Sequence, residues 1–175
     1  FDQKANICDN TVAPARVEES IKNMALELAV RCVEALGGVG IFGVEMFLTS
    51  DKEVLVNEIA PRPHNSGHYT IEACITSQFE QHLRAITGLP LGSTELIIPA
   101  VMVNLLGAEG YQGKPCFEGV EDILRIPGVN LHIYGKKETR PYRKMGHITI
   151  VDKNLDSALE KAETVRKTIK VISEG

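Results

Sequence analysis

Two glutamates, Glu45 and Glu58, each interrupt a segment that is otherwise apolar. The segments 39–49 and 54–60 are rich in Val, Ile and Phe, and a polar stretch of four residues separates them. This pattern predicts two strands joined by a hairpin turn. A carboxylate inside an apolar strand needs a chemical explanation, because an uncompensated buried charge is costly.

The pairing register of the predicted hairpin decides what the two glutamates can do. If Thr49 faces Val54 across the turn, counting inward places Glu45 directly opposite Glu58, on one face of the hairpin. Two carboxylates so placed repel each other, and a divalent cation such as Mg²⁺ would compensate them because it prefers oxygen ligands. A register slipped by one residue would put Glu58 on the other face and remove the argument. The alternative is a pair of ordinary solvated glutamates.

The loop after the second predicted strand gathers polar side chains between two prolines and a glycine. Its arginine can form paired hydrogen bonds to a carboxylate or phosphate, and its imidazoles can exchange protons near neutral pH. Polar loops that follow strands commonly carry function. A structural turn with solvated histidines is the alternative. The side chains concerned are Arg62, His64, Asn65, Ser66 and His68.

A second group of charged residues is basic, although the whole chain has a net charge of −4. It offers charge-assisted hydrogen bonds that suit a compact phosphate monoester. The segment is short and has one aromatic side chain, Tyr142, so it is a poor nucleic-acid surface. A solvated hairpin edge is the alternative. The basic residues are Lys136, Lys137, Arg140, Arg143, Lys144 and His147.

The composition is that of an ordinary globular protein of 175 residues, with 43% hydrophobic and 24% charged residues. No apolar run is long enough to cross a bilayer, and the chain opens with no signal peptide, so we expect a cytoplasmic protein. Widely spaced cysteines predict reduced thiols used for packing. His82 and His132 are assigned to packing as well, without nearby partners. The cysteines are Cys8, Cys32, Cys74 and Cys116.

The periodicity of apolar residues predicts an α+β fold. Ser157 and Glu160 have the spacing of a capping box. The chain begins at Phe1 without Met, and residues 1–12 read as a strand and loop entered midway, so we expect a fragment of a longer protein. We expect helices at 17–36, 70–87 and 156–172, and strands at 39–49, 54–60, 99–105, 131–134 and 147–151.

The sequence Val-Asn-Glu-Ile-Ala-Pro-Arg-Pro-His-Asn-Ser-Gly-His-Tyr-Thr at 56–70 resembles the signature of the N5-carboxyaminoimidazole ribonucleotide synthases. These are ATP-grasp enzymes of purine biosynthesis, fused in fungi to a carboxylase domain. Further matches lie at 40–47, 76–86 and 140–148, and the resemblance is closest to the fungal branch. It spans nearly the whole chain and is weakest over 107–130.

The resemblance implies the C-terminal half of an ATP-grasp domain, an antiparallel sheet with packed helices, at 1–106. A small C-terminal β/α lobe would follow at 107–175. The family's enzymes use ATP and Mg²⁺ or Mn²⁺ to carboxylate 5-aminoimidazole ribonucleotide with bicarbonate, giving ADP and phosphate. They are usually homodimers and bind neither nucleic acid nor membranes. Because the glycine-rich phosphate loop of the family is missing, we expect the chain to be inactive alone.

The resemblance also assigns roles to individual residues. Glu45 and Glu58 would hold the metal. Arg62 would meet bicarbonate and act in catalysis together with His64. The ATP contacts implied are Asn57, Glu58 and Gln3. The contacts to the aminoimidazole nucleotide implied are His64, Asn65 and Ser66, with Lys137, Arg140, Arg143 and Lys144 around its phosphate.

Two other functions stay open at this point. A formate-dependent ATP-grasp glycinamide ribonucleotide transformylase shares Pro-Arg-Pro-His but continues Asp-Thr-Gly-Met, whereas this chain has Asn-Ser-Gly-His at 65–68. A non-catalytic binding module derived from the ATP-grasp fold is the other. One departure from the wider superfamily concerns the metal, because Ala60 stands where many members have a metal-binding Asn.

Overall fold

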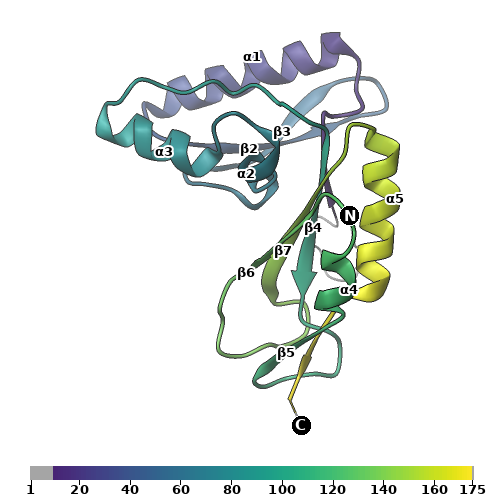
Figure 1. The fold of residues 1–175 in the computed structure, drawn as a ribbon. Helices are drawn as coiled ribbons and strands as arrows, with labels where there is room; N and C mark the ends of the chain where they lie inside the picture. The colour runs from purple at the N-terminus through teal and green to yellow at the C-terminus, as the bar shows by residue number, and fades with distance from the viewer. Residues whose placement is uncertain (1–9, 175) are drawn as a thin grey trace. The chain divides into compact units, whose positions relative to one another are not determined.

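The computed structural model describes residues 10–174 (Figure 1). The chain forms two compact units, one of residues 15–95 and the other of residues 10–14 with 96–174. The two units divide between Glu95 and Leu96, and the strand at 100–106 lies inside the sheet of the second unit. Within the described residues, no helix has the length and apolar character needed to span a membrane.

The first unit, residues 15–95, is built on a two-stranded antiparallel hairpin and three helices. The first helix ends at Gly37, whose φ of 61° is the left-handed conformation that glycine adopts readily. The predicted strand at 54–60 is confirmed at both ends. The elements are α1 (Glu19–Leu36), β2 (Gly43–Leu48), β3 (Val54–Ala60), the 3₁₀ turn η1 (Asn65–Gly67), α2 (Thr70–Ala73) and α3 (Gln78–Thr87).

The prediction of one continuous helix at 70–87 is wrong. The backbone is extended at Cys74, where α2 ends, and α3 begins after Ser77. The Ser77 side chain accepts a hydrogen bond from the Glu80 amide and so caps α3. The amide of Ile75 donates to the Glu95 carbonyl, which holds the break in place. Apolar spacing continues through the break, so periodicity alone did not indicate it.

The two faces of the hairpin differ in character. On one face, Val44, Met46 and Leu48 line an apolar groove of about 340 Å³ together with α1 residues such as Ile21. Successive strand residues alternate between faces, so Glu45 lies on the other face. The helix therefore occupies the apolar side and leaves the carboxylate side of the hairpin to the loop that follows β3.

The second unit consists of a four-stranded antiparallel sheet, a two-stranded ribbon and two helices. The sheet has the order β1-β4-β7-β6, and the ribbon pairs β5 with β8. Together these strands and helices enclose the main core. The elements are β1 (Asn10–Ala13), β4 (Ala100–Leu106), β5 (Pro115–Glu118), α4 (Val120–Leu124), β6 (Val129–Ile133), β7 (Lys144–Val151), α5 (Leu155–Thr168) and β8 (Lys170–Ser173).

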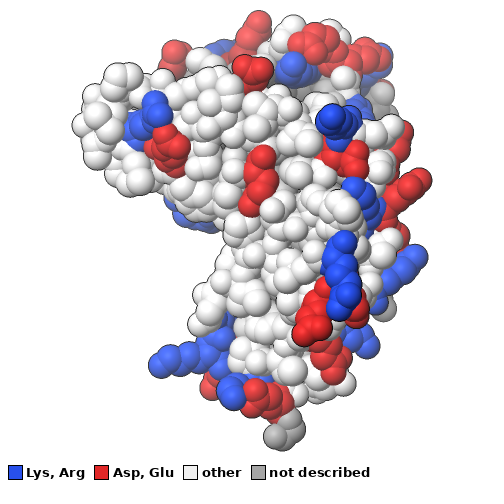
Figure 2. Space-filling model, in the orientation of Figure 1, with Lys and Arg blue, Asp and Glu red and all other residues white. Residues whose placement is uncertain are grey.

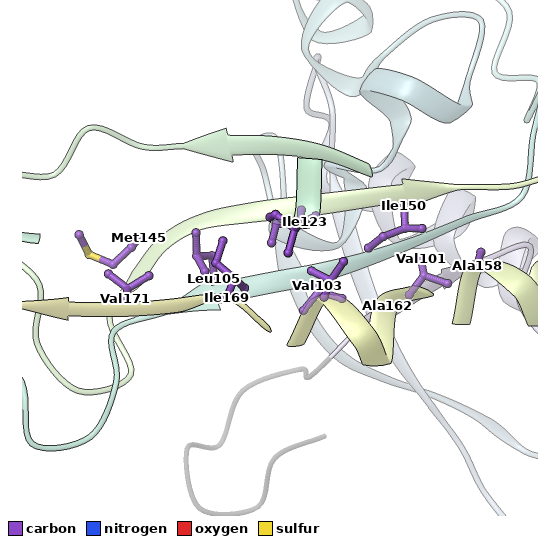
Figure 3. Close-up of a cluster of buried hydrophobic side chains, with 12 residues drawn as sticks. Val101, Val103, Leu105, Ile123, Met145, Ile150, Ala158, Ala162, Ile169 and Val171 are labelled. Atoms are coloured by element: carbon purple, nitrogen blue, oxygen red, sulfur yellow. The ribbon is translucent and has the colours of Figure 1, made fainter. Parts of the chain in front are cut away.

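The core of this unit lies between the sheet and α5 (Figure 3). Val101 and Ile150 from neighbouring strands and Ala158 from the helix are completely buried. Figure 3 shows the side chains of β4 pointing toward those of α5. Removal of this apolar surface from water is the main stabilising contribution to the unit.

Two predictions about the C-terminal segment are wrong. The helix ends at Thr168, because residues 170–173 leave it to form β8 against β5. The helix is capped by the Asn154 side chain, which accepts hydrogen bonds from the amides of Asp156 and Ser157, and not by a capping box from Ser157. The strands predicted at 131–134 and 147–151 each begin earlier, as β6 and β7.

Candidate metal and nucleotide site

Glu45 and Glu58 are paired directly across the β2–β3 hairpin, as the sequence predicts. The predicted register at the turn is nevertheless wrong, because Val54 pairs with Leu48 and not with Thr49. A β-bulge between Glu45 and Met46 places Asn57 as the extra residue on β3 and restores the pairing of the two glutamates. The bulge therefore decides that both carboxylates share one face.

The two carboxylates converge on the imidazole of His64. Its Nε2 atom lies 3.5 Å from Oε1 of Glu45 and 3.7 Å from Oε1 of Glu58. One donor atom from each of the three residues lies within 4.8 Å of the others. The Glu45 and Glu58 side chains are 38% and 57% exposed, so their remaining oxygen lone pairs are accessible. Two carboxylates with accessible oxygens are a suitable donor set for a hard divalent cation, and the imidazole lies beside them.

The hydrogen bonds of His64 define the tautomer of its ring. Its Nδ1 atom accepts from the Ser66 amide at 3.4 Å and lies 2.8 Å from the Ser66 hydroxyl. Because Nδ1 is an acceptor, the proton of the neutral ring is on Nε2. That N–H is directed toward the carboxylate pair, so His64 offers partial positive charge to two anionic groups.

The position of His64 depends on two residues that the sequence analysis did not single out. The amide of Gln78 binds both backbone groups of His64: its Oε1 accepts from the His64 N–H and its Nε2 donates to the His64 carbonyl, each at 2.8 Å. A Cβ atom at Gly43 would lie 2.6 Å from Cβ of His64. A glycine inside a strand often marks such a close approach, and that was the available signal.

The other predicted residues of this loop lie near the pair with different environments. Arg62 is exposed and its Nη1 donates to the Pro63 carbonyl at 3.1 Å. The Asn57 amide lies 3.4 Å from Oε2 of Glu45. Asn65 is half-buried in the turn η1. Gln3 lies outside the described residues.

The basic segment belongs to the second unit and connects β6 to β7. Lys137 and Arg140 are exposed, and Arg143 and Lys144 are half-buried. Figure 2 shows blue side chains gathered at the end of this unit where that connection lies. The turn is fixed because the Gly107 amide donates to the Arg143 carbonyl at 2.9 Å. The segment is thus a shaped turn that exposes Lys137 and Arg140 and holds Arg143 and Lys144 half-buried.

Lys136 is close enough to Arg143, Arg140 and Lys144 to feel their charges, although it was not among the phosphate contacts predicted. Burial lowers the pKa of Lys136 below its usual range, and the charges of Arg143, Arg140 and Lys144 lower it further. Its ammonium donates to the Lys144 carbonyl at 2.6 Å. The repulsion that this pKa reflects would be relieved by a bound anion.

The two histidines assigned to packing have partners, contrary to the prediction. His82 accepts a hydrogen bond from the Ile41 amide at 3.1 Å. His132 stacks on His147 with ring centres 4.3 Å apart, and the Tyr134 hydroxyl lies 3.0 Å from Nδ1 of His147. Both histidines therefore join neighbouring elements of their own unit.

The described cysteines are free thiols, as predicted from their spacing. Burial raises the pKa of the Cys74 thiol, which makes it less reactive. Cys8 lies outside the described residues. The remaining thiols are Cys32, Cys74 and Cys116.

Comparison with known proteins finds a family model for each of two parts of the chain. Residues 2–79 match the ATP-grasp domain, and residues 100–161 match the phosphoribosylaminoimidazole carboxylase C-terminal domain. The N5-carboxyaminoimidazole ribonucleotide synthase of Bacillus subtilis is 51% identical over 156 residues. The chain belongs to the N5-carboxyaminoimidazole ribonucleotide synthase family. The match covers 89% of this chain but 40% of the Bacillus subtilis protein.

The chain is also similar to fungal proteins and to members of the family whose structures have been solved. The phosphoribosylaminoimidazole carboxylase of Schizosaccharomyces pombe is 54% identical over 157 residues, which are 85% of this chain and 28% of that protein. The structure of the Thermotoga maritima synthetase has a TM-score of 0.92 and 68% identity, covering 94% of this chain and 46% of that chain. These identities do not single out the fungal branch, which the sequence patterns favoured.

A further solved structure carries ligands. The Aspergillus clavatus N5-carboxyaminoimidazole synthase was solved in complex with ADP and 5-aminoimidazole ribonucleotide. It is 41% identical, with a TM-score of 0.83, and the match covers 93% of this chain and 44% of that chain. The described fold is therefore that of the ATP-grasp synthases, with less than half of their length present in each of these matches.

Proposed function

We propose that this chain is the part of an ATP-dependent ligase that carboxylates 5-aminoimidazole ribonucleotide with bicarbonate. The products are N5-carboxyaminoimidazole ribonucleotide, ADP and phosphate, and the reaction belongs to purine biosynthesis. The observation that carries the proposal is the convergence of three side chains: Glu45 and Glu58 share one face of the hairpin, and His64 reaches them from the signature loop that follows β3.

Glu45 and Glu58 would hold Mg²⁺ or Mn²⁺. Their opposed carboxylates fit such an ion, because their repulsion is relieved by a cation and their oxygens stay accessible. A bound divalent cation neutralises charge at a transferring phosphoryl group. Ala60 offers no side-chain oxygen, so phosphate and water oxygens would complete the coordination.

The polar residues around the pair would orient the reactants. Asn57 lies beside Glu45 and would contact ATP, as Gln3 would from outside the described residues. The exposed guanidinium of Arg62 can bind the two oxygens of bicarbonate or carboxyphosphate side by side. His64, Asn65 and Ser66 would face the aminoimidazole nucleotide. His64 would present its Nε2 proton to groups held near the carboxylates.

The basic turn would bind the 5′-phosphate of that nucleotide. Lys137 and Arg140 extend from it into solvent, and Arg143 and Lys144 stand beside Lys136. A dianionic phosphate would relieve the mutual repulsion of these cations. This supports a phosphate site at the basic turn.

We further propose that the chain is inactive alone, since it spans 40% of the Bacillus subtilis synthase. The complete protein would form a homodimer, with or without a fused carboxylase domain. Residues 1–106 would be the C-terminal half of the ATP-grasp domain and residues 107–175 the C-terminal lobe.

Calorimetric titration of 5-aminoimidazole ribonucleotide into the chain, with Mg²⁺ and ADP, tests the proposal. The double variant Lys137→Ala/Arg140→Ala removes two exposed cations of the turn. The variant Lys153→Ala/Lys170→Ala removes two exposed cations from elsewhere in the same unit and is the matched control. Saturable binding that the first variant loses and the second keeps supports the proposal, and equal loss in both contradicts it.

A further inference from the structure

Gln78 is a buried amide that binds the backbone of one proposed active-site residue at two points. It is 7% exposed and is the first residue of α3. Its Oε1 accepts from the His64 N–H and its Nε2 donates to the His64 carbonyl, both at 2.8 Å. The same Nε2 lies 3.0 Å from Nδ1 of His68. This pattern fixes both the orientation of the amide and the backbone of the loop.

The loop packs closely against the Gln78 amide at Gly67. A Cβ atom at Gly67 would lie 2.5 Å from Oε1 of Gln78, so a side chain there would displace the amide. The backbone of Gln78 donates to Thr70 Oγ1 at 2.9 Å, and that hydroxyl donates to the Gly67 carbonyl at 2.6 Å. Three hydrogen-bonded links therefore tie residues 64–70 to the start of α3.

We infer that Gln78 is a positioning residue that holds the His64 imidazole over the Glu45–Glu58 carboxylate pair. The His64 carbonyl also accepts a hydrogen bond from the Gly67 amide within the turn. Gln78 binds the N–H and the carbonyl of His64 together, from a different element. Its ring rests on Gly43, so a small backbone shift would move Nε2 away from oxygens that are 3.5 and 3.7 Å distant. The inference rests on the proposed function only for the role that His64 plays.

The same helix offers a matched control. Gln81 is also buried and binds one residue by the same two bonds: its Oε1 accepts from the Gly92 N–H at 2.8 Å and its Nε2 donates to the Gly92 carbonyl at 3.0 Å. Gly92 lies in the segment after α3, outside the loop of His64. Loss of either glutamine removes a pair of hydrogen bonds to one residue's backbone, but only Gln78 touches the His64 loop, where it also contacts His68.

The experiment compares Gln78→Met and Gln81→Met, which keep side-chain length and remove the amide. The readout is the ¹⁵N NMR spectrum of the His64 ring at mildly alkaline pH, where the Nδ1 and Nε2 resonances of one tautomer are well separated. We expect this separation to narrow in Gln78→Met, because the ring loses its fixed contacts and its tautomers mix. Gln81→Met should leave it unchanged. An unchanged His64 spectrum in a folded Gln78→Met, or equal changes in both variants, would overturn the inference.

A second measurement uses the wild-type chain and does not depend on the variants folding. Nuclear Overhauser contacts from the Gln78 side-chain NH₂ to the His64 and His68 residues should be present, and exchange of those NH₂ protons with solvent should be slow. Fast exchange without such contacts would overturn the inference. Neither NMR readout involves nucleotide or metal. The role of Gln78 is therefore tested independently of the calorimetric test of the proposed function.

Discussion

Neutralising one member of the carboxylate pair should stabilise the free protein and abolish its response to divalent cations. The ligand oxygens of Glu45 and Glu58 lie within 4.8 Å of each other. At 4.8 Å two unit charges repel by about 0.9 kcal/mol at the dielectric constant of water and by about 3.5 kcal/mol at an effective value near 20. Both side chains are partly solvated, so we expect Glu58→Gln to gain about 1 kcal/mol in free energy of unfolding without divalent cations.

The sign should reverse when Mg²⁺ or Mn²⁺ is added. A cation that binds the native state at a hundredfold excess over its Kd stabilises the protein by about 2.7 kcal/mol. The wild type should gain this stability, and Glu58→Gln should gain little because one of its two carboxylate ligands is gone. Wild type should therefore be the less stable protein in EDTA and the more stable one at saturating cation.

Urea unfolding with and without EDTA measures these changes, and amide hydrogen exchange in the hairpin 43–60 localises them. Glu53→Gln is the control, since Glu53 lies in the turn of the same hairpin and outside the carboxylate–imidazole group. A loss of stability for Glu58→Gln in EDTA would refute the repulsion argument. Cation stabilisation of equal size in wild type and Glu58→Gln would refute the assignment of Glu58 as a metal ligand.

Three further changes test the positioning of the site and the stability of the second unit. Gly43→Ala places a Cβ atom 2.6 Å from Cβ of His64 and should cost about 1–3 kcal/mol through overpacking, with a displaced His64 ring signal in NMR. Asn154→Ala removes the cap of α5 and should cost about 1 kcal/mol in urea unfolding. The Asn154 N–H, followed by the Lys161 ammonium, holds the pKa of Asp152 below its usual value. Asp152→Asn should therefore destabilise the protein above about pH 4, and the difference from wild type should vanish as pH falls through the lowered folded pKa.

Controls for the last two predictions come from neighbouring residues. Ser157→Ala should have little effect on stability, because the side chain of Asn154 makes the cap; a cost equal to that of Asn154→Ala would restore the capping box as the explanation. For Asp152, a difference from wild type that persists at the acid end of the titration would show that the carboxylate charge does not contribute as described.

The sequence predicted the carboxylate pair correctly but through an incorrect register. The turn places Lys52 at a φ of 64°, a conformation that its residue type does not signal, and the register beside this turn is shifted by one residue from the predicted one. The bulge at Asn57 then compensates for that shift. Strand pattern gives the alternation of faces, whereas bulges depend on contacts that local sequence does not encode.

The end of α5 shows the same limit in another element. Ile169 and Ile172 continue the apolar spacing of the helix, yet the backbone leaves it because Ile172 pairs with Cys116 across the β5–β8 ribbon. The site has a corresponding gap, since Gln78 is remote from His64 in sequence and carries no chemistry of its own. Both depend on contacts between distant segments, which periodicity and motif spacing do not report.

The carboxylate pair keeps its charged oxygens accessible to a cation. A lysine or arginine bound to both glutamates would remove their repulsion, but it would also occupy the oxygens that a metal needs. His64 approaches each carboxylate at 3.5 and 3.7 Å, longer than an ordinary hydrogen bond. The imidazole therefore reduces the repulsion between the two carboxylates and leaves their oxygens accessible. The exposed fractions of the two side chains, 38% and 57%, keep the residual cost small enough for the hairpin to hold this arrangement before any cation binds.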